Sequence, residues 1–89
     1  MAHIYFTPNL TRHTECPPLE FAASSVAELL TKYFERWPDV RGFVLDDQGR
    51  VRKHVKVLVD GQNMHDRMRL TDILQVDSEV HVFQALSGG

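Results

Sequence analysis

Residues 25–38 read SVAELLTKYFERWP, and this stretch predicts one amphipathic helix. Ser25 followed by Glu28 is the pattern of a capping box, in which the two side chains bind free backbone N–H groups at the helix start. Pro38 should end the helix near Arg36 or Trp37, because proline disfavours helical backbone in the residue before it. The apolar side chains recur at the spacing of a single helical face, which we expect to pack into a core rather than to hold a cofactor. They are Val26, Leu29, Leu30, Tyr33, Phe34 and Trp37.

Segments that favour strands lie on both sides of this helix. Strands are expected at residues 2–7, 19–22, 43–45, 51–59 and 79–85. Asp46-Asp47-Gln48-Gly49 and Asp60-Gly61 are turn sequences. Residues 66–77 look irregular, with one short helical turn expected at residues 71–74. This order predicts an α+β domain, in which a mixed sheet of four or five strands covers one main helix.

The size and charge of the chain limit what it can be. Its 89 residues are enough for one domain and one core. The formal net charge of −2 lacks the basic excess of a nucleic-acid binder, so we expect no nucleic acid as a partner. The apolar runs are shorter than a membrane span, and the first residues do not resemble a signal peptide. We therefore expect no membrane contact and a cytoplasmic location.

Few residues suggest intrinsic catalysis or metal binding. The histidines form no spacing typical of a metal site, so we expect no metal, and we expect His3 and His81 to be solvated on one face of the sheet. Cys16 is the single cysteine and is expected to be a partly exposed loop thiol. The basic run at residues 50–56 has no interleaved aromatic residue, which favours an exposed charged hairpin over an RNA site.

The most specific feature is the Gly88-Gly89 pair that ends the sequence. It follows closely on the last predicted strand, so we divide the chain into a domain at residues 1–85 and a flexible tail at residues 86–89. Residues 85–89 span at most about 17 Å when extended. Since glycine has no Cβ, this tail could enter a narrow channel and bring its carboxylate to the nucleotide of another protein. The residues in question are Ala85, Leu86, Ser87, Gly88 and Gly89.

Three stretches bear on the family of the chain, namely VKVLVDG at residues 55–61, DSEVHVF at residues 77–83 and ALSGG at residues 85–89. Together they resemble the ThiS/MoaD family of ubiquitin-like sulfur-carrier proteins. The resemblance implies the β-grasp fold for nearly the whole chain. Residues 46–55, DDQGRVRKHV, are similar to the subgroup that includes the carrier used in cysteine biosynthesis.

The resemblance also implies a role for Gly89. A ubiquitin-activating-type adenylyltransferase would use ATP to adenylate its carboxylate, and sulfur would then replace AMP to leave a thiocarboxylate. A sulfur-accepting synthase would use that sulfur for molybdopterin, thiamin or cysteine, and the chain could be the small subunit of such a synthase. The chain itself would be no enzyme and would bind no cofactor. Two alternatives stay open: a ubiquitin-like modifier joined to lysines through Gly89, and a non-catalytic β-grasp interaction module.

Strand parity predicts a surface where these partners would dock. Tyr5 and Leu58 each lie between two residues that are expected to face the core, and Phe83 follows one such residue. Because side chains alternate along a strand, all three should face away from the core. In the family's fold the three strands lie side by side. The resemblance therefore implies an exposed apolar patch beside the tail.

Overall fold

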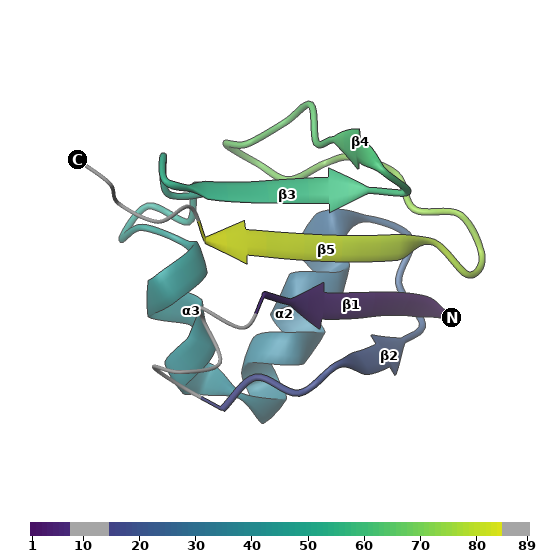
Figure 1. The fold of residues 1–89 in the computed structure, drawn as a ribbon, viewed down its shortest axis with the longest axis horizontal. Coiled ribbons are helices and arrows are strands. Elements are labelled where there is room, and N and C mark those ends of the chain that lie inside the picture. Colours follow the sequence, from purple (N-terminus) through teal and green to yellow (C-terminus); the bar gives the residue numbers. More distant parts are fainter. Residues whose placement is uncertain (8–14, 85–89) are drawn as a thin grey trace.

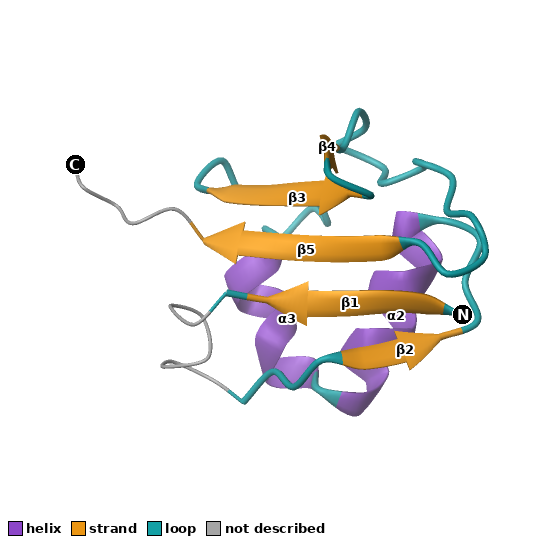
Figure 2. Ribbon diagram, turned by 45° about the vertical axis from the view of Figure 1, so that its right-hand side comes forward, coloured by secondary structure: helices purple, strands orange, loops and turns teal. Residues whose placement is uncertain are grey.

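The chain folds into a five-stranded sheet with helices packed on one of its faces (Figures 1 and 2). The computed structural model describes residues 1–7 and 15–84. The strand order is β2-β1-β5-β3-β4, with β1 and β5 parallel and the other neighbours antiparallel. This architecture confirms the predicted α+β class and its mixed sheet. The elements are β1 (Ala2–Phe6), β2 (Leu19–Phe21), α2 (Val26–Arg36), α3 (Pro38–Val44), β3 (Val55–Val59), β4 (Gln62–Asn63) and β5 (Glu79–Gln84).

Helix α2 begins and ends where the sequence predicts. The Ser25 side chain accepts a hydrogen bond from the Glu28 backbone N–H at 3.2 Å, as in a capping box. The Glu28 carboxylate accepts its return bond from the N–H of Ser24, at 2.7 Å, instead of from Ser25. At the other end, the Trp37 N–H donates to the Tyr33 carbonyl. The helix is thus fixed at both ends by the residues that the pattern singled out.

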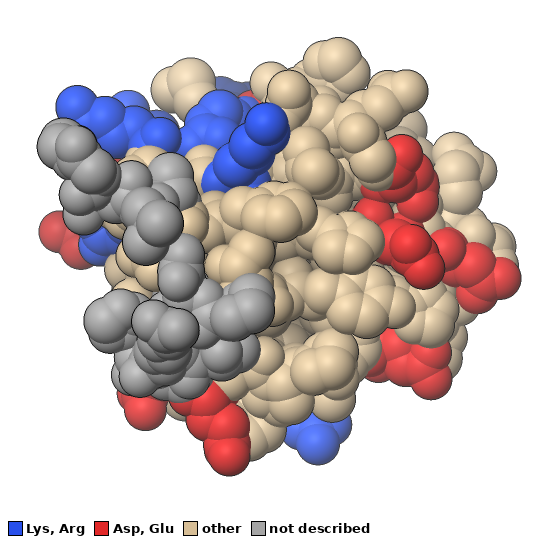
Figure 3. Space-filling view, in the orientation of Figure 1, with Lys and Arg blue, Asp and Glu red and all other residues tan. Residues whose placement is uncertain are grey.

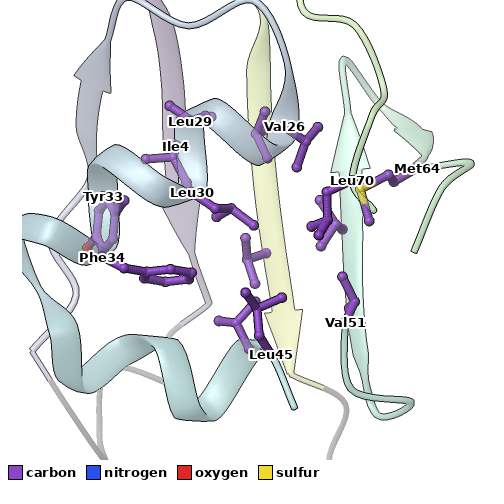
Figure 4. Close-up of a cluster of buried hydrophobic side chains, with 14 of the residues drawn as sticks. Ile4, Val26, Leu29, Leu30, Tyr33, Phe34, Leu45, Val51, Met64 and Leu70 are labelled. Atoms are coloured by element: carbon purple, nitrogen blue, oxygen red, sulfur yellow. The ribbon is translucent and has the colours of Figure 1, made fainter. Parts of the chain in front are cut away.

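The core lies between the apolar face of α2 and one face of the sheet. Figure 4 shows Val26 and Leu30 on the side of the helix that faces the strands, with Ile4 opposite. Ile4 and Val80 are fully buried, and Val57 is 1% exposed. Burial alternates along β1, β3 and β5, because successive side chains of a strand point to opposite faces. One face of the sheet is therefore covered by the helices, while no described helix covers the other, which we call the open face (Figure 1).

Helix α3 corrects the prediction of a strand at residues 43–45. Pro38 lies at the first position of the helix, where its fixed φ is already helical and its missing N–H costs no hydrogen bond. Val40 and Val44 then lie one turn apart, and both are fully buried. A short apolar run fits a strand or a buried helix equally well, so the pattern alone did not separate them. Leu45 forms only an isolated bridge with Val51.

Two loop predictions also differ from the structure. The strand expected at residues 51–59 begins only at Val55, since the Val51 N–H donates to the carbonyl of Arg67 in a loop instead of entering the sheet. Residues 71–74 form no helical turn, because Ile73 pairs with Ser25 in an isolated bridge. The Asp60-Gly61 turn is confirmed, with φ values of 51° and 85°, and it leads into the short strand β4, which the sequence did not suggest.

Cys16 corrects a further prediction, because its side chain is buried. It is only 3% exposed and belongs to the core cluster, so the expected partly exposed thiol is wrong. The next residue, Pro17, accepts a 2.7 Å hydrogen bond from the Tyr33 hydroxyl, which holds this loop against α2. Burial raises the pKa of the Cys16 thiol, so the residue behaves as a small core side chain.

Candidate docking face and C-terminal site

The predicted reactive end of the chain lies outside the described residues. Ala85, Leu86, Ser87, Gly88 and Gly89 all belong to that part. The last described residue, Gln84, ends β5, and its backbone N–H donates to the Thr7 side chain at 3.4 Å. The structure therefore shows the surface from which the tail departs, and the role of Gly89 stays a prediction.

The three predicted docking residues lie together on the open face. Strand pairing places His81 of β5 opposite Tyr5 of β1 and also opposite Leu58 of β3. The Tyr5 ring stacks on the His81 imidazole, with ring centroids 4.8 Å apart and planes 18° apart. The Phe83 ring follows at 6.3 Å from His81. Tyr5, His81, Leu58 and Phe83 thus form one continuous strip, which we call the aromatic strip.

The aromatic strip is half-buried, whereas the sequence suggested an exposed patch. Its rings cover one another across the strands, which removes part of each from solvent. His81 was expected on this face as a solvated side chain, and the structure shows that it instead stacks on Tyr5 within the strip. At the end of β1 and β5 the strip borders a shallow hollow of about 210 Å³, lined in part by Thr7 and Phe83. A partner side chain could enter that hollow.

Charged side chains lie at both ends of the aromatic strip. Lys56 pairs with Phe83 across β3 and β5, at the end where the tail leaves the domain. At the opposite end, Glu79 pairs with His3, whose Nδ1 is 3.3 Å from a carboxylate oxygen of Glu20. In Figure 3, Lys and Arg side chains gather at the upper left, toward the start of β3, and Asp and Glu side chains gather at the right.

The basic run at residues 50–56 divides into structural and unpaired groups. Arg50 forms an ion pair with Asp46 at 3.3 Å, and the Arg50 backbone N–H lowers the pKa of that carboxyl. The Arg52 guanidinium donates to the Gly42 carbonyl at 2.8 Å. These arginines hold the loop before β3 in place. The run is therefore no uniform exposed hairpin, and only its lysines project without such bonds in the described structure.

Neither a metal cluster nor a membrane helix is present within residues 1–7 and 15–84. No group of three or more His, Cys, Asp or Glu side chains is placed to hold a metal there. His3 and His81 do share the open face, as the sequence predicted, but His3 contacts Glu20 and His81 contacts Tyr5. None of the helices described is long and apolar enough to cross a membrane.

The fold is the α+β β-grasp that the resemblance implied, and solved structures of small proteins share it over nearly the whole chain. SAMP1 from Haloferax volcanii matches with a TM-score of 0.79 and 19% identity, covering 99% of this chain and 98% of that one. A chain of the BexX/CysO complex from Amycolatopsis orientalis matches with a TM-score of 0.83, 14% identity and full coverage of both chains.

CysO from Mycobacterium tuberculosis also matches, with a TM-score of 0.80 and 11% identity, covering 97% of this chain and all of that one. No family model and no curated protein sequence matches the chain. At such low identities the likeness establishes the fold, and function has to be argued from the residues.

Proposed function

We propose that this protein is a ubiquitin-like sulfur carrier, which transfers sulfur as a thiocarboxylate on Gly89. The observation that carries the proposal is the Gly88-Gly89 pair, which follows the last strand of a β-grasp sheet after three residues in the sequence. Solved structures of CysO and of SAMP1 share the fold over nearly their whole length, which supports the same general class of carriers and modifiers.

The chemistry at Gly89 would be supplied by partner proteins. The Gly89 carboxylate attacks the α-phosphorus of ATP on a ubiquitin-activating-type adenylyltransferase, and pyrophosphate leaves. The acyl-adenylate is a mixed anhydride, so a sulfide donor can attack its carbonyl carbon and displace AMP. A thiocarboxylate remains on Gly89. A sulfur-accepting synthase then uses its sulfur to make molybdopterin, thiamin or cysteine. The carrier needs no general base or cofactor of its own for these steps, and we place them in the cytoplasm.

The open face would bind the activating enzyme. Tyr5, Leu58 and Phe83 are large apolar side chains on neighbouring strands, and His81 joins them into one strip. Apolar and aromatic groups of this kind are the usual anchors of protein interfaces. The match to a chain of the BexX/CysO complex supports binding of a partner protein, because that structure contains two different proteins.

Intact mass spectrometry of protein purified from its native host tests this function. A carrier should appear in two forms, which differ by the exchange of one oxygen for sulfur. Alkylation with iodoacetamide should modify only the heavier form and should modify Gly89, because Cys16 is buried in the folded chain. The carrier function is wrong if the heavier form never occurs, even when sulfur-donor genes that neighbour the gene of this protein are expressed.

A second function, covalent modification of proteins, has one observation in its favour. A solution structure of the small archaeal modifier protein 1 from Methanosarcina acetivorans matches with a TM-score of 0.79 and 17% identity. As a modifier, the chain would form an amide bond between Gly89 and a lysine of another protein. Extracts of the native host would then contain a ladder of conjugates that disappears when Gly89 is deleted.

A further inference from the structure

The open face has opposite charges at its two ends. Lys56 lies opposite Phe83, where β5 ends and the tail begins. Glu79 lies opposite His3, where β5 starts. Since a strand rises about 3.3 Å per residue, the backbone positions of Glu79 and Phe83 are roughly 13 Å apart. The aromatic strip fills the space between them, so the charge along the direction of β5 changes from acidic through apolar to basic.

The lysines at the basic end are not used by the fold. Lys53 and Lys56 are both exposed and form no hydrogen bond or ion pair within residues 1–7 and 15–84. Lys32 on α2 provides the contrast, because its ammonium group donates to the Ala22 carbonyl and lies 3.9 Å from Glu28. The two lysines near the tail are thus left available to a partner.

One carboxylate at the acidic end is equally available. Asp60 accepts hydrogen bonds from the Glu79 N–H and the Ser78 hydroxyl, and Asp77 pairs with the N-terminal ammonium group. Glu20 contacts His3 at 3.3 Å. The exposed Glu79 side chain makes no such contact in the described part of the chain. A free negative charge therefore stands at the end of the face that is farthest from the tail.

We propose that the open face binds its partner protein in one orientation, which these charges select. The partner surface would be apolar at its centre, acidic where it meets Lys56, and basic where it meets Glu79. The inference rests on the proposed function, because a tail that must reach an active site needs a fixed direction of docking. Complementary charges across an interface steer the encounter and fix its register more than they raise its affinity.

A second copy of this chain, turned end to end, would also match these charges. The partner protein is the better occupant, because the unpaired Lys56 lies opposite Phe83, close to the end of β5 at Gln84. Figure 3 shows Lys and Arg side chains at the same end of the molecule, where β3 starts in Figure 1. A self-dimer would place the acidic end of one copy over the tail exit of the other. A carrier in that state could not present Gly89.

Charge reversal on the face tests the proposal. The probe is the ubiquitin-activating-type enzyme of the same organism, assayed by ATP–pyrophosphate exchange with the carrier as the varied substrate. Lys56→Glu and Glu79→Lys should each raise KM by roughly 3- to 10-fold with kcat nearly unchanged, and added salt should shrink the difference. Arg69→Glu and Glu35→Lys make the same charge changes at exposed positions away from the face, and they should leave KM unchanged.

Each outcome has a definite meaning. If the unchanged chain is active and the variants on the open face have the same KM as the control variants, this inference is overturned. The proposed function would still stand. No exchange with the unchanged chain would overturn both. Sedimentation of the free protein tests whether a second copy of the chain binds the open face. A dimer that dissociates in the Lys56→Glu variant would assign the face to self-association. The milder variants Lys56→Gln and Glu79→Gln replace any charge-reversal variant that does not fold. They remove one charge instead of reversing it, so we expect about half the effect on log KM.

Discussion

The Asp66 carboxylate accepts four hydrogen bonds from the loop that follows it. The donors are the N–H groups of Met68, Arg69 and Thr71, together with the Thr71 hydroxyl at 2.6 Å. These bonds lower the pKa of Asp66 from 3.8 to about 2, and the Thr71 hydroxyl contributes most. The charged form of Asp66 is the one that accepts these hydrogen bonds. One ionised side chain therefore fixes the turn at the start of residues 66–77, a segment that the sequence predicts to be mostly irregular.

The low pKa of Asp66 predicts how its contribution depends on pH. Because the folded-state pKa is depressed, the stabilisation is fully present above pH 3.8 and is lost as pH falls toward 2. Asp66→Asn should therefore lower the urea midpoint at neutral pH, and the gap to the unchanged protein should close between those two pH values. Asp47→Asn, at an exposed carboxylate without a hydrogen bond in the described structure, is the control and should show no such gap. A gap that persisted at pH 2 would contradict the assignment.

Single residues were the hardest scale to predict from the sequence. Cys16 was expected at the surface because it lies in a loop between polar residues and prolines, yet the loop folds onto α2 and buries it. His81 was seen to have the parity of the open face, but its stacking on Tyr5 depends on the register between β1 and β5. Register is set by tertiary pairing, and a residue pattern within one strand does not contain it.

Elements were predicted well where periodicity and capping agreed. Helix α2 has a full apolar face, a serine N-cap and a proline stop, and its bounds came out within a residue or two. The segment before β3 has none of these signals. Its position depends on Arg67, whose guanidinium donates at 2.6 Å to the carbonyls of Arg52 and Val55. Such contacts between distant loops leave no local pattern to read.

Strand parity predicts opposite effects for two phenylalanines. Phe83 lies on the open face, whereas Phe6 packs against the core with its ring 4.9 Å from Tyr33. Phe83→Ala should weaken binding to the activating enzyme by about 1–2 kcal/mol and change the unfolding free energy little. Phe6→Ala should destabilise the fold by about 2–4 kcal/mol, because it removes a ring from the core.

A binding titration and a urea melt of both variants check this pair. If Phe83→Ala unfolded the protein, its side chain would belong to the core and the parity argument would be wrong. If it changed neither affinity nor stability, the docking surface would lie elsewhere.

The ends of β3 and β5 are joined by a buried hydroxyl. The Ser78 side chain is 2% exposed, donates to the Asp60 carboxylate at 2.8 Å and accepts from the Gln75 N–H at 2.8 Å. Ser78→Ala would leave the Gln75 N–H and one Asp60 oxygen without these partners. We expect a loss of about 1–2 kcal/mol in unfolding free energy, measured by urea denaturation. Ser24→Ala removes an exposed hydroxyl and serves as the control, with a smaller loss expected. Equal losses would show that burial of the bond is unimportant.

At the scale of the whole molecule, the described core and the proposed reactive end consist of different residues. Every residue of the described core cluster lies between Ala2 and Val82, and residues 85–89 lie outside the described part of the chain. The fold was predictable because helix, turns and strand parity agreed with one another. The proposed partner surface was predictable only in part, since its charges come together through the arrangement of several strands. The proposed role of Gly89 rests on its chemistry and not on packing.

This separation predicts that changes at Gly89 abolish activation without affecting the fold. Deleting Gly89, or adding two residues after it, removes the carboxylate from the position where ATP is attacked, so pyrophosphate exchange by the activating enzyme should fall to background. The urea midpoint should stay that of the unchanged chain, because no member of the core cluster is altered. The same two residues added before Met1 are the matched control and should leave exchange well above background, since the start of β1 pairs with the start of β5 and not with its end at Gln84. Normal exchange by the C-terminally extended form would show that Gly89 is not the adenylated group, and the carrier and modifier functions would fall together.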